Sequence, residues 1–280
     1  MILVKKKADL QNLCRSYRST GQSIGFVPTM GALHAGHLAL IKKCREQNNR
    51  SICSIFVNPT QFNNSADFEK YPVTIGQDIN LLEAAGCDVL FLPSVLEMYP
   101  PGEPTIQYDL GPIEHILEGK YRPGHFQGVC NIVDKLLDAT KPDQLYLGQK
   151  DYQQCMVIRK MMHLKDHRMG LQICDTLREP GGLAMSSRNV RLSEADKRTA
   201  ALLIETLRNI QQQLKPGDTQ DLIAEAQHNL TNHGFAVDYV EVAAAKDLSP
   251  LKKWDGEEKA VALAAATLNE VRLIDNIFLN

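Results

Sequence analysis

The sequence lacks the features that mark several classes of protein. No apolar run approaches the roughly 20 residues that a membrane-spanning helix needs. The seven cysteines include no Cys-x-x-Cys pair, and their odd number fits a reducing compartment better than a disulfide framework. The formal net charge of −2 does not indicate the basic surface that proteins use to bind DNA or RNA. We therefore expect neither a membrane protein, nor a disulfide-stabilised scaffold, nor a nucleic-acid binder.

The amino end also lacks an export signal. Residues 1–7 contain three lysines but no long apolar stretch and no small-residue cleavage site. Internal repeats and low-complexity tracts are absent as well. We therefore expect a cytoplasmic location.

What the sequence contains is typical of an α/β enzyme. Its 280 residues, 44% apolar and 23% charged, can bury a full core. Apolar strand-like runs alternate with helical periods, which favours a parallel sheet covered by helices, here a Rossmann-like doubly wound fold. The expected strands are residues 24–27, 51–57, 88–92, 144–147 and 171–175, and the expected helices are residues 38–47, 75–85, 127–139 and 152–163.

The pattern changes after about residue 175. A long helix begins at Ser193, a break follows at residues 215–218, and a second helix spans residues 219–232. Three strand-like runs then follow at residues 236–243, 260–266 and 271–278. We expect a Rossmann-like domain over residues 1–175 and a smaller α+β domain, with antiparallel strands, over residues 176–280, the second closing over a nucleotide as a lid.

The most informative motif is Pro28-Thr29-Met30-Gly31-Ala32-Leu33-His34-Ala35-Gly36-His37, between an expected strand and an expected helix. A helix start offers N–H groups and a partial positive charge to anions, and α/β proteins hold nucleotide phosphates in this way. His34 and His37 are three residues apart, so they lie on one face of the first turn. The His-x-Gly-His spacing resembles the superfamily of nucleotidyl-transferring enzymes that includes class I aminoacyl-tRNA synthetases.

Four further polar segments lie at expected strand ends or in loops. They are residues 56–62 (Phe-Val-Asn-Pro-Thr-Gln-Phe), 119–129 with Arg-Pro-Gly-His-Phe-Gln-Gly-Val, 148–154 (Gly-Gln-Lys-Asp-Tyr-Gln-Gln) and 185–189 (Met-Ser-Ser-Arg-Asn). Three of them have a plain structural alternative: a proline turn for residues 56–62, a solvated lysine for 148–154 and a serine-rich turn for 185–189. Because parallel strands gather their following loops at one edge, we expect ligand binding there.

Taken together and in this order, the five motifs resemble the pantothenate synthetase (pantoate–β-alanine ligase) family over essentially the whole chain. The resemblance implies an AMP-forming acid–amine ligase that condenses (R)-pantoate with β-alanine through a pantoyl adenylate, releasing pyrophosphate. It also implies a homodimer, and magnesium bridging the phosphate oxygens of ATP. The small-molecule partners would be ATP, pantoate and β-alanine.

The resemblance also implies roles for individual residues. His34, His37 and Lys150 would be catalytic, with His37 as a proton donor, and Gln61 and Gln154 would bind pantoate, Gln61 also lying beside β-alanine. The implied ATP-binding residues are Met30, Gly31, Ala32, Leu33, His34, Ala35, Gly36, His37, Gly148, Gln149, Lys150, Asp151, Leu177, Met185, Ser186, Ser187 and Arg188.

Three points stay open at this level. Asp78 is a candidate magnesium ligand or a residue that supports one, and equally an acidic residue favoured in a first helical turn. A nucleotidyltransferase that stops at an adenylylated product would share the histidine motif. A nucleotide-binding regulator without catalysis would share it too, although the polar loops favour chemistry.

Overall fold

The computed structural model describes residues 1–63 and 68–280, which form two compact units. The first unit comprises Met1–Gly148 and Gln154–Asp175, and the second comprises Gln149–Gln153 and Thr176–Asn280. A short segment from the middle of the chain therefore packs with the carboxyl-terminal part.

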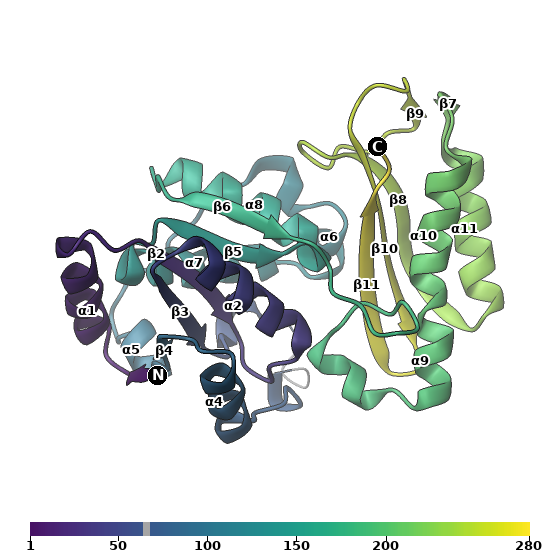
Figure 1. The fold of residues 1–280 in the computed structure, drawn as a ribbon. Coiled ribbons are helices and arrows are strands. Elements are labelled where there is room, and N and C mark those ends of the chain that lie inside the picture. The colour runs from purple at the N-terminus through teal and green to yellow at the C-terminus, as the bar shows by residue number, and fades with distance from the viewer. Residues whose placement is uncertain (64–67) are drawn as a thin grey trace. The chain divides into compact units, whose positions relative to one another are not determined.

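The first unit is built on a six-stranded sheet in which every neighbouring pair is parallel (Figure 1). The strand order is β1-β4-β3-β2-β5-β6. The strands are β1 (Ile2–Val4), β2 (Ile24–Thr29), β3 (Arg50–Ile55), β4 (Val89–Phe91), β5 (Gln144–Gly148) and β6 (Gly170–Cys174). The helices, with 3-10 turns marked η, are α1 (Lys7–Ser19), α2 (Ala35–Gln47), η1 (Pro59–Gln61), α4 (Ile75–Ala84), α5 (Val95–Met98), η2 (Gly111–Glu114), α6 (Glu118–Tyr121), α7 (His125–Thr140) and α8 (Tyr152–Leu164).

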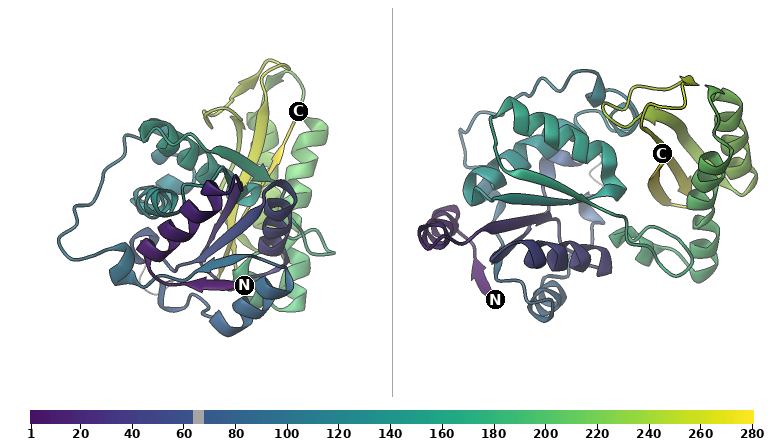
Figure 2. Two further views of the ribbon diagram at one scale, coloured as in Figure 1. Left: turned by 60° about the vertical axis from the view of Figure 1, so that its left-hand side comes forward. Right: turned by 45° about the horizontal axis from the view of Figure 1, so that its top comes forward.

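Helices cover both faces of this sheet, α2 and α4 on one and α7 and α8 on the other (Figure 2). The connections from β2 run outward through β3 to β4, and the chain then returns to β5 on the opposite side of β2. The direction of winding therefore reverses between β2 and β5, which is where ligands bind in open α/β sheets. The prediction of a doubly wound parallel sheet is confirmed.

One part of the core explains how α2 and α4 are held. Apolar side chains from adjacent strands meet those of the two helices in one buried cluster. Its members include Val27, Cys53 and Leu90 from the strands, Ile41 and Cys44 from α2 and Leu82 from α4, each 0% exposed. Close packing extends to Gly25, where a Cβ atom would lie 2.4 Å from the sulfur of Cys44.

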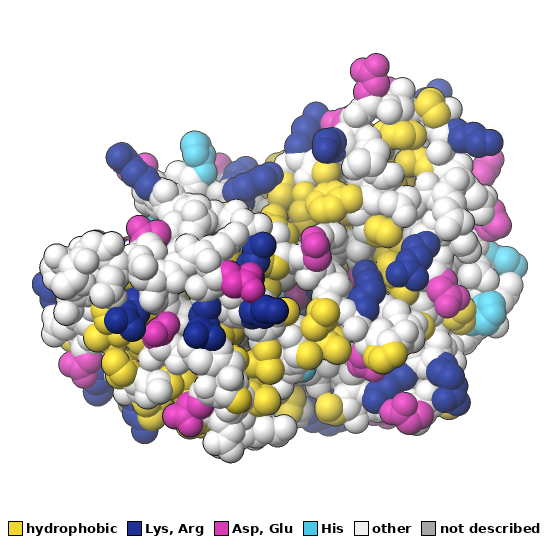
Figure 3. Space-filling view, viewed as in Figure 1, with side chains coloured by type: hydrophobic (Ala, Val, Ile, Leu, Met, Phe, Trp, Pro, Cys, Tyr) yellow, Lys and Arg dark blue, Asp and Glu magenta, His cyan; other side chains and the backbone are white. Residues whose placement is uncertain are grey.

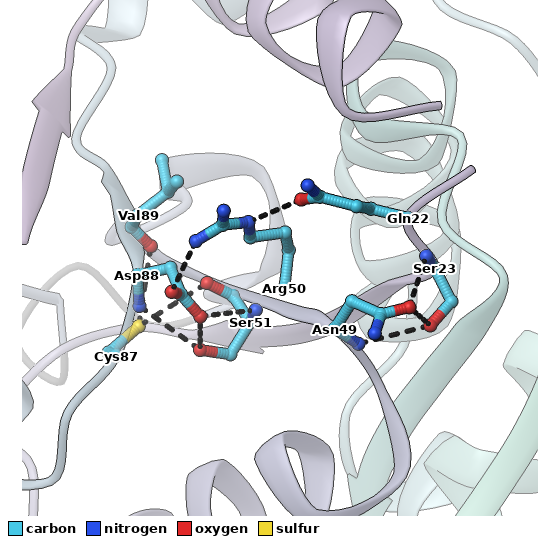
Figure 4. Close-up of polar contacts among 8 residues, drawn as sticks. All are labelled: Gln22, Ser23, Asn49, Arg50, Ser51, Cys87, Asp88 and Val89. Carbon is cyan, nitrogen blue, oxygen red and sulfur yellow. Dashed lines mark hydrogen bonds and ion pairs between the residues drawn. The ribbon is translucent and has the colours of Figure 1, made fainter. Parts of the chain in front are cut away.

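A polar cluster lies at the amino ends of β3 and β4, at the edge of the sheet opposite to the loops that carry the motifs (Figure 4). Asp88 accepts hydrogen bonds from the N–H and hydroxyl of Ser51, at 2.8 and 2.7 Å, and pairs with Arg50 at 3.2 Å. Gln22 accepts from Nε of the same arginine. These groups satisfy one another at the sheet edge remote from the motif-bearing loops, so they join strands and offer no substrate site.

The second unit has a three-stranded antiparallel sheet in the order β11-β10-β8. Helices α10 and α11 pack on one face of it around alternating alanines of β10. Its elements are η3 (Gln149–Asp151), η4 (Ser187–Arg191), α9 (Glu194–Ala200), α10 (Leu202–Gln213), β7 (Gly217–Asp218), α11 (Gln220–Asn232), β8 (Phe235–Ala244), β9 (Lys253–Trp254), β10 (Ala260–Leu268) and β11 (Val271–Phe278). The antiparallel α+β prediction for the carboxyl-terminal part is confirmed.

Within the described residues, none of the helices combines the length and the apolar character needed to cross a membrane. On the face drawn in Figure 3, lysine and arginine side chains are interspersed with acidic and uncharged ones. All seven cysteines are free thiols, and six are buried. Burial raises the pKa of Cys14 to about 11 and that of Cys44 to about 12, so both thiols stay protonated and unreactive at neutral pH.

Candidate active site

The loop between β2 and α2 folds around the carboxylate of Asp78. Gly31 and Ala32 have positive φ angles of 83° and 48°, a curl that turns successive N–H groups inward. The Asp78 oxygens accept the N–H of Ala32 at 3.0 Å and that of Leu33 at 2.8 Å. They also accept the hydroxyl of Thr74 at 3.1 Å. Asp78 is 0% exposed, so a buried anion of the protein itself shapes the loop.

The two histidines form a pair at the start of α2. His34 is the N-cap residue, and its Nδ1 accepts the N–H of Gly36 at 3.2 Å. Nδ1 of His37 accepts the N–H of His34 at 3.3 Å. A ring nitrogen that accepts a hydrogen bond carries no proton, so each neutral ring carries its hydrogen on Nε2. The ring centroids lie 4.0 Å apart, as expected for residues on one face of the turn.

This geometry shows where part of the donor capacity around the start of α2 is used. The start of α2 was expected to offer unpaired N–H groups to a phosphate, yet those of Ala32, Leu33, His34 and Gly36 all donate within the protein. Asp78 accepts the first two of these hydrogen bonds, and the Nδ1 atoms of the two imidazoles accept the other two.

Gln61 lies after β3 and is held from three sides. Its Oε1 accepts from Nδ2 of Asn58 at 3.2 Å, and its Nε2 approaches the sulfur of Met30 at 2.8 Å. Its backbone carbonyl accepts from Nδ1 of His125 at 2.8 Å. Gly128 allows the close approach of α7, because a Cβ there would lie 2.3 Å from the carbonyl oxygen of Thr60. The amide of Gln61 is thus fixed in one orientation and 9% exposed.

Other implied residues of the first unit occupy strand and helix ends. Gly148 closes β5 and Gln154 is a half-buried residue in the first turn of α8. Met30, Ala35 and the histidines belong to the loop and helix that follow β2.

Lys150 belongs to the second unit. It lies in the 3-10 turn η3, its side chain is 21% exposed, and its Nζ lies 3.7 Å from the carboxylate of Asp151. The backbone of this turn is held by Asn276 of β11, whose Nδ2 donates to the carbonyls of Gln149 and Lys150, each at 2.9 Å. The backbone that carries Lys150 is therefore held by Asn276.

The Met-Ser-Ser-Arg segment also lies in the second unit. Ser186 caps η4 by accepting the N–H of Arg188 at 3.3 Å, and all four residues are half-buried. The preceding chain doubles back, so that the N–H of Met185 donates to the carbonyl of Leu177 at 3.0 Å. Asn189 ties this turn down through its Nδ2, which donates to Glu179 and to the carbonyl of Ala184.

Several residues that shape these groups escaped the sequence interpretation. His125 lies within a quoted motif, so its position was signalled although its contact with Gln61 was not. Asn58 was noted only as a polar residue on a turn. Asp275 and Asn276 lie in strand β11, where alternation predicts structure and nothing marks a link to a distant turn.

Comparison with known proteins decides the family. The family model for pantoate-beta-alanine ligase matches residues 2–278. The chain belongs to this family. A pantothenate synthetase of Bacteroides thetaiotaomicron is 41% identical over 272 residues, covering 96% of this chain and 95% of the relative. One of Acetivibrio thermocellus is 42% identical over 285 residues, covering 99% of each chain.

Solved structures of the family agree with the fold. Pantothenate synthetase from Thermus thermophilus superposes with a TM-score of 0.90 at 36% identity, covering 100% of this chain and 99% of that one. Pantoate-beta-alanine ligase from Francisella tularensis, described as complexed with beta-gamma ATP and beta-alanine, gives a TM-score of 0.82 at 38% identity. It covers 100% of this chain and 98% of its own. The family resemblance seen in the five motifs is thus confirmed over both units.

Proposed function

We propose that this chain condenses (R)-pantoate with β-alanine at the expense of ATP, giving pantothenate, AMP and pyrophosphate. Family membership along nearly the whole chain supports the reaction class. The observation that carries the mechanism is the pair of imidazoles at the start of α2, whose Nδ1 atoms accept backbone N–H groups. We assign their Nε2 atoms to the phosphate oxygens.

In the first half-reaction an oxygen of the pantoate carboxylate attacks the α-phosphorus. A new P–O bond forms as the bond to the β-phosphate bridging oxygen breaks, and pyrophosphate leaves with the electron pair. Negative charge shifts toward the leaving group, so donors fixed in advance stabilise the transition state more than water does. We assign this role to His34 and His37, with His37 as proton donor, and to Lys150 and Arg188 as cations.

In the second half-reaction the unprotonated amine of β-alanine attacks the acyl carbon. The C–N bond forms, the C–O bond to phosphate breaks, AMP leaves with the carboxylate oxygen, and the amine loses a proton to solvent or base. Gln61 and Gln154 are assigned to pantoate, and Gln61 also to the β-alanine side. The remaining ATP contacts are assigned to residues 30–37, 148–151 and 185–188, and to Leu177 beside adenine. Its carbonyl already accepts one hydrogen bond.

Magnesium is assigned to the ATP phosphates. Mg²⁺ commonly binds through substrate phosphates and a few carboxylates. Asp78 fits direct coordination poorly, because it is fully buried and its oxygens accept three hydrogen bonds from Ala32, Leu33 and Thr74. We therefore propose that Asp78 supports the loop, the second of the roles expected for it, and we derive no step through a protein-held metal.

The test separates this activity from the adenylyltransferase alternative. The protein is incubated with ATP, Mg²⁺ and pantoate, with and without β-alanine, and AMP, ADP and pantothenate are measured. We expect AMP and pantothenate to rise together, in equal amounts, only when both substrates are present. Accumulation of an adenylylated product at the same rate without the amine would favour the alternative. ATP binding with no turnover in a folded sample would favour a regulator.

Three further assignments remain predictions: a homodimer, which the family resemblance implies, and a cytoplasmic location and a lid role for residues 176–280, which the sequence itself predicts. The first is tested by light scattering coupled to size-exclusion chromatography, where a dimer has twice the mass of the chain.

A further inference from the structure

Asn276 forms hydrogen bonds through both polar atoms of its side-chain amide. It is 3% exposed, and its Nδ2 donates to two successive carbonyls, those of Gln149 and Lys150, each at 2.9 Å. Its Oδ1 accepts from Nε2 of Gln149 at 3.2 Å. Both donors and the acceptor of one amide are thus directed at a single turn.

The turn is short, and the residue that follows it is held by the same strand. The element η3 spans three residues, too short to be stable by its own hydrogen bonds. It is followed by Tyr152, whose hydroxyl donates to the carbonyl of Ala245 at 2.8 Å and whose ring meets Phe278 edge-on at 5.2 Å. Asn276 and Phe278 are two apart on β11 and share one face of the sheet. The turn is therefore fastened to this face at two points.

The neighbouring residue on β11 holds the other cationic segment. Asp275 is 4% exposed and accepts two hydrogen bonds from the guanidinium of Arg178, at 2.6 and 3.0 Å. Arg178 also donates to the carbonyl of Gly182 and forms an antiparallel bridge with Ala184. This ion pair fixes the doubled-back chain that leads directly into Ser186–Arg188.

We propose that Asp275 and Asn276 form a clamp that sets Lys150 and Arg188 relative to each other within the second unit. Successive strand residues point to opposite faces, so one dipeptide can hold two segments on two sides of β11. Two cations held at a fixed separation suit a polyphosphate chain, whose charges are spaced along its length. Both residues are positioning residues, and the proposal rests on the proposed roles of Lys150 and Arg188.

The test measures pantoate-dependent exchange between ATP and pyrophosphate, which reports the first half-reaction alone. Replacing Asn276→Ala removes the donors to Gln149 and Lys150, and a displacement of about 1 Å costs about 100-fold. We expect exchange to fall 10- to 100-fold. Asn276→Asp, nearly the same size, places a negative oxygen against two carbonyls and should do the same.

A double-mutant cycle separates positioning from general damage. In a Lys150→Ala background, Asn276→Ala should cost less than 3-fold more, because the group that it positions is already gone. Equal fold losses in both backgrounds would overturn the proposal. Asp275→Asn should likewise lose its effect in an Arg188→Ala background.

Asn280→Ala is the matched control. Asn280 lies at the same end of the chain, and its amide accepts from the N–H of Ala260 and donates to the carbonyl of Glu258, touching neither cationic segment. We expect its exchange rate to stay within 2-fold of the unsubstituted protein. Should Asn280→Ala lose as much exchange as Asn276→Ala, the effect is general to this end of the chain and the clamp is refuted.

Three outcomes would overturn the clamp, and they differ in what else fails with it. If Lys150→Ala exchanges normally, the proposed role of Lys150 fails, and the clamp falls with it. If Lys150→Ala is impaired while both Asn276 variants, folded by circular dichroism, exchange normally, only the clamp fails. If both Asn276 variants lose their fold, Asn276 supports the unit as a whole and the proposal is also overturned.

Discussion

Replacing Asp78→Asn tests how the histidine loop is held. The substitution keeps the size of the side chain but removes its charge and turns one acceptor oxygen into an NH2 group. Since the two oxygens face the N–H groups of Ala32 and Leu33 at 3.0 and 2.8 Å, one of these donors then faces another donor. The loop can satisfy only one of them without moving.

The magnitude follows from these contacts. A hydrogen bond to a charged group contributes about 1.5–3 kcal/mol, and an uncharged one about 1 kcal/mol. One charge-assisted bond is lost and the others weaken, so we expect the free energy of unfolding to fall by about 3 kcal/mol. A domain with a typical stability of about 5–15 kcal/mol still folds. Ala32, whose φ of 48° costs about 1 kcal/mol, is then free to leave its left-handed conformation.

The expected functional loss comes from displacement of the two histidines that follow. A misplacement of about 1 Å costs about 100-fold in rate. Urea unfolding gives the stability, and steady-state turnover is measured over a range of Mg²⁺ concentrations. We expect a reduced kcat that excess Mg²⁺ does not restore. Ala32→Gly, which removes the left-handed strain, should partly restore turnover in the Asp78→Asn background.

Asp221→Asn serves as the matched control, because Asp221 is an acidic first-turn residue of α11 and is exposed. It should leave turnover unchanged. If Asp78→Asn unfolds at the same urea concentration as the unsubstituted protein and turns over normally, the loop does not depend on this carboxylate. If excess Mg²⁺ restores full turnover, Asp78 is a metal ligand and our assignment is refuted.

Three other predictions concern separate parts of the first unit. His37→Ala should lower the rate of adenylate formation by about 100- to 1,000-fold with little change in stability, and near-normal turnover would refute the donor role. Gln61→Ala should raise the KM for pantoate more than that for ATP, whereas equal effects would indicate a folding role. Burial raises the pKa of Asp134, but hydrogen bonds from His167 and Tyr108 outweigh it and hold that pKa below its ordinary value. A lowered carboxyl pKa stabilises the fold at pH values above the unfolded pKa, near 3.8, and this contribution is lost as pH falls through the folded pKa. Tyr108→Phe removes one of these hydrogen bonds, so it should lower the free energy of unfolding at pH 7 by about 1.5–3 kcal/mol. In urea unfolding, the difference from the unsubstituted protein should shrink below about pH 4. A constant difference across that range would contradict the last prediction.

The elements of the parallel sheet could be predicted because their signals are local. Strand β2 is a short continuous apolar run, and helix α2 follows it along the chain. In the antiparallel sheet of the second unit, the strand at 271–278 was predicted with the bounds that the structure gives. Helix α2 begins at Ala35, earlier than expected, because its cap is His34, a residue outside the usual capping set. Strand β1 was missed because it has three residues, and two of them, Ile2 and Leu3, are exposed.

The supports of the candidate site could not be predicted from the sequence. Asp78 binds N–H groups 46 and 45 residues away, and every residue type except proline offers such a group. Asn276 binds carbonyls 127 and 126 residues away for the same reason. A side chain that recognises backbone leaves no complementary residue to find, so only the fold reveals such pairs.

The central claim is that the pantoate carboxylate attacks the α-phosphorus of ATP. The most direct measurement uses pantoate whose carboxylate carries heavy oxygen, with ATP, Mg²⁺ and β-alanine, and mass spectrometry of the nucleotide products. The account predicts AMP that contains one labelled oxygen in its phosphate, because the C–O bond breaks when the amine attacks. Label in inorganic phosphate, with ADP as the nucleotide product, would place the attack at the γ-phosphorus and contradict the account.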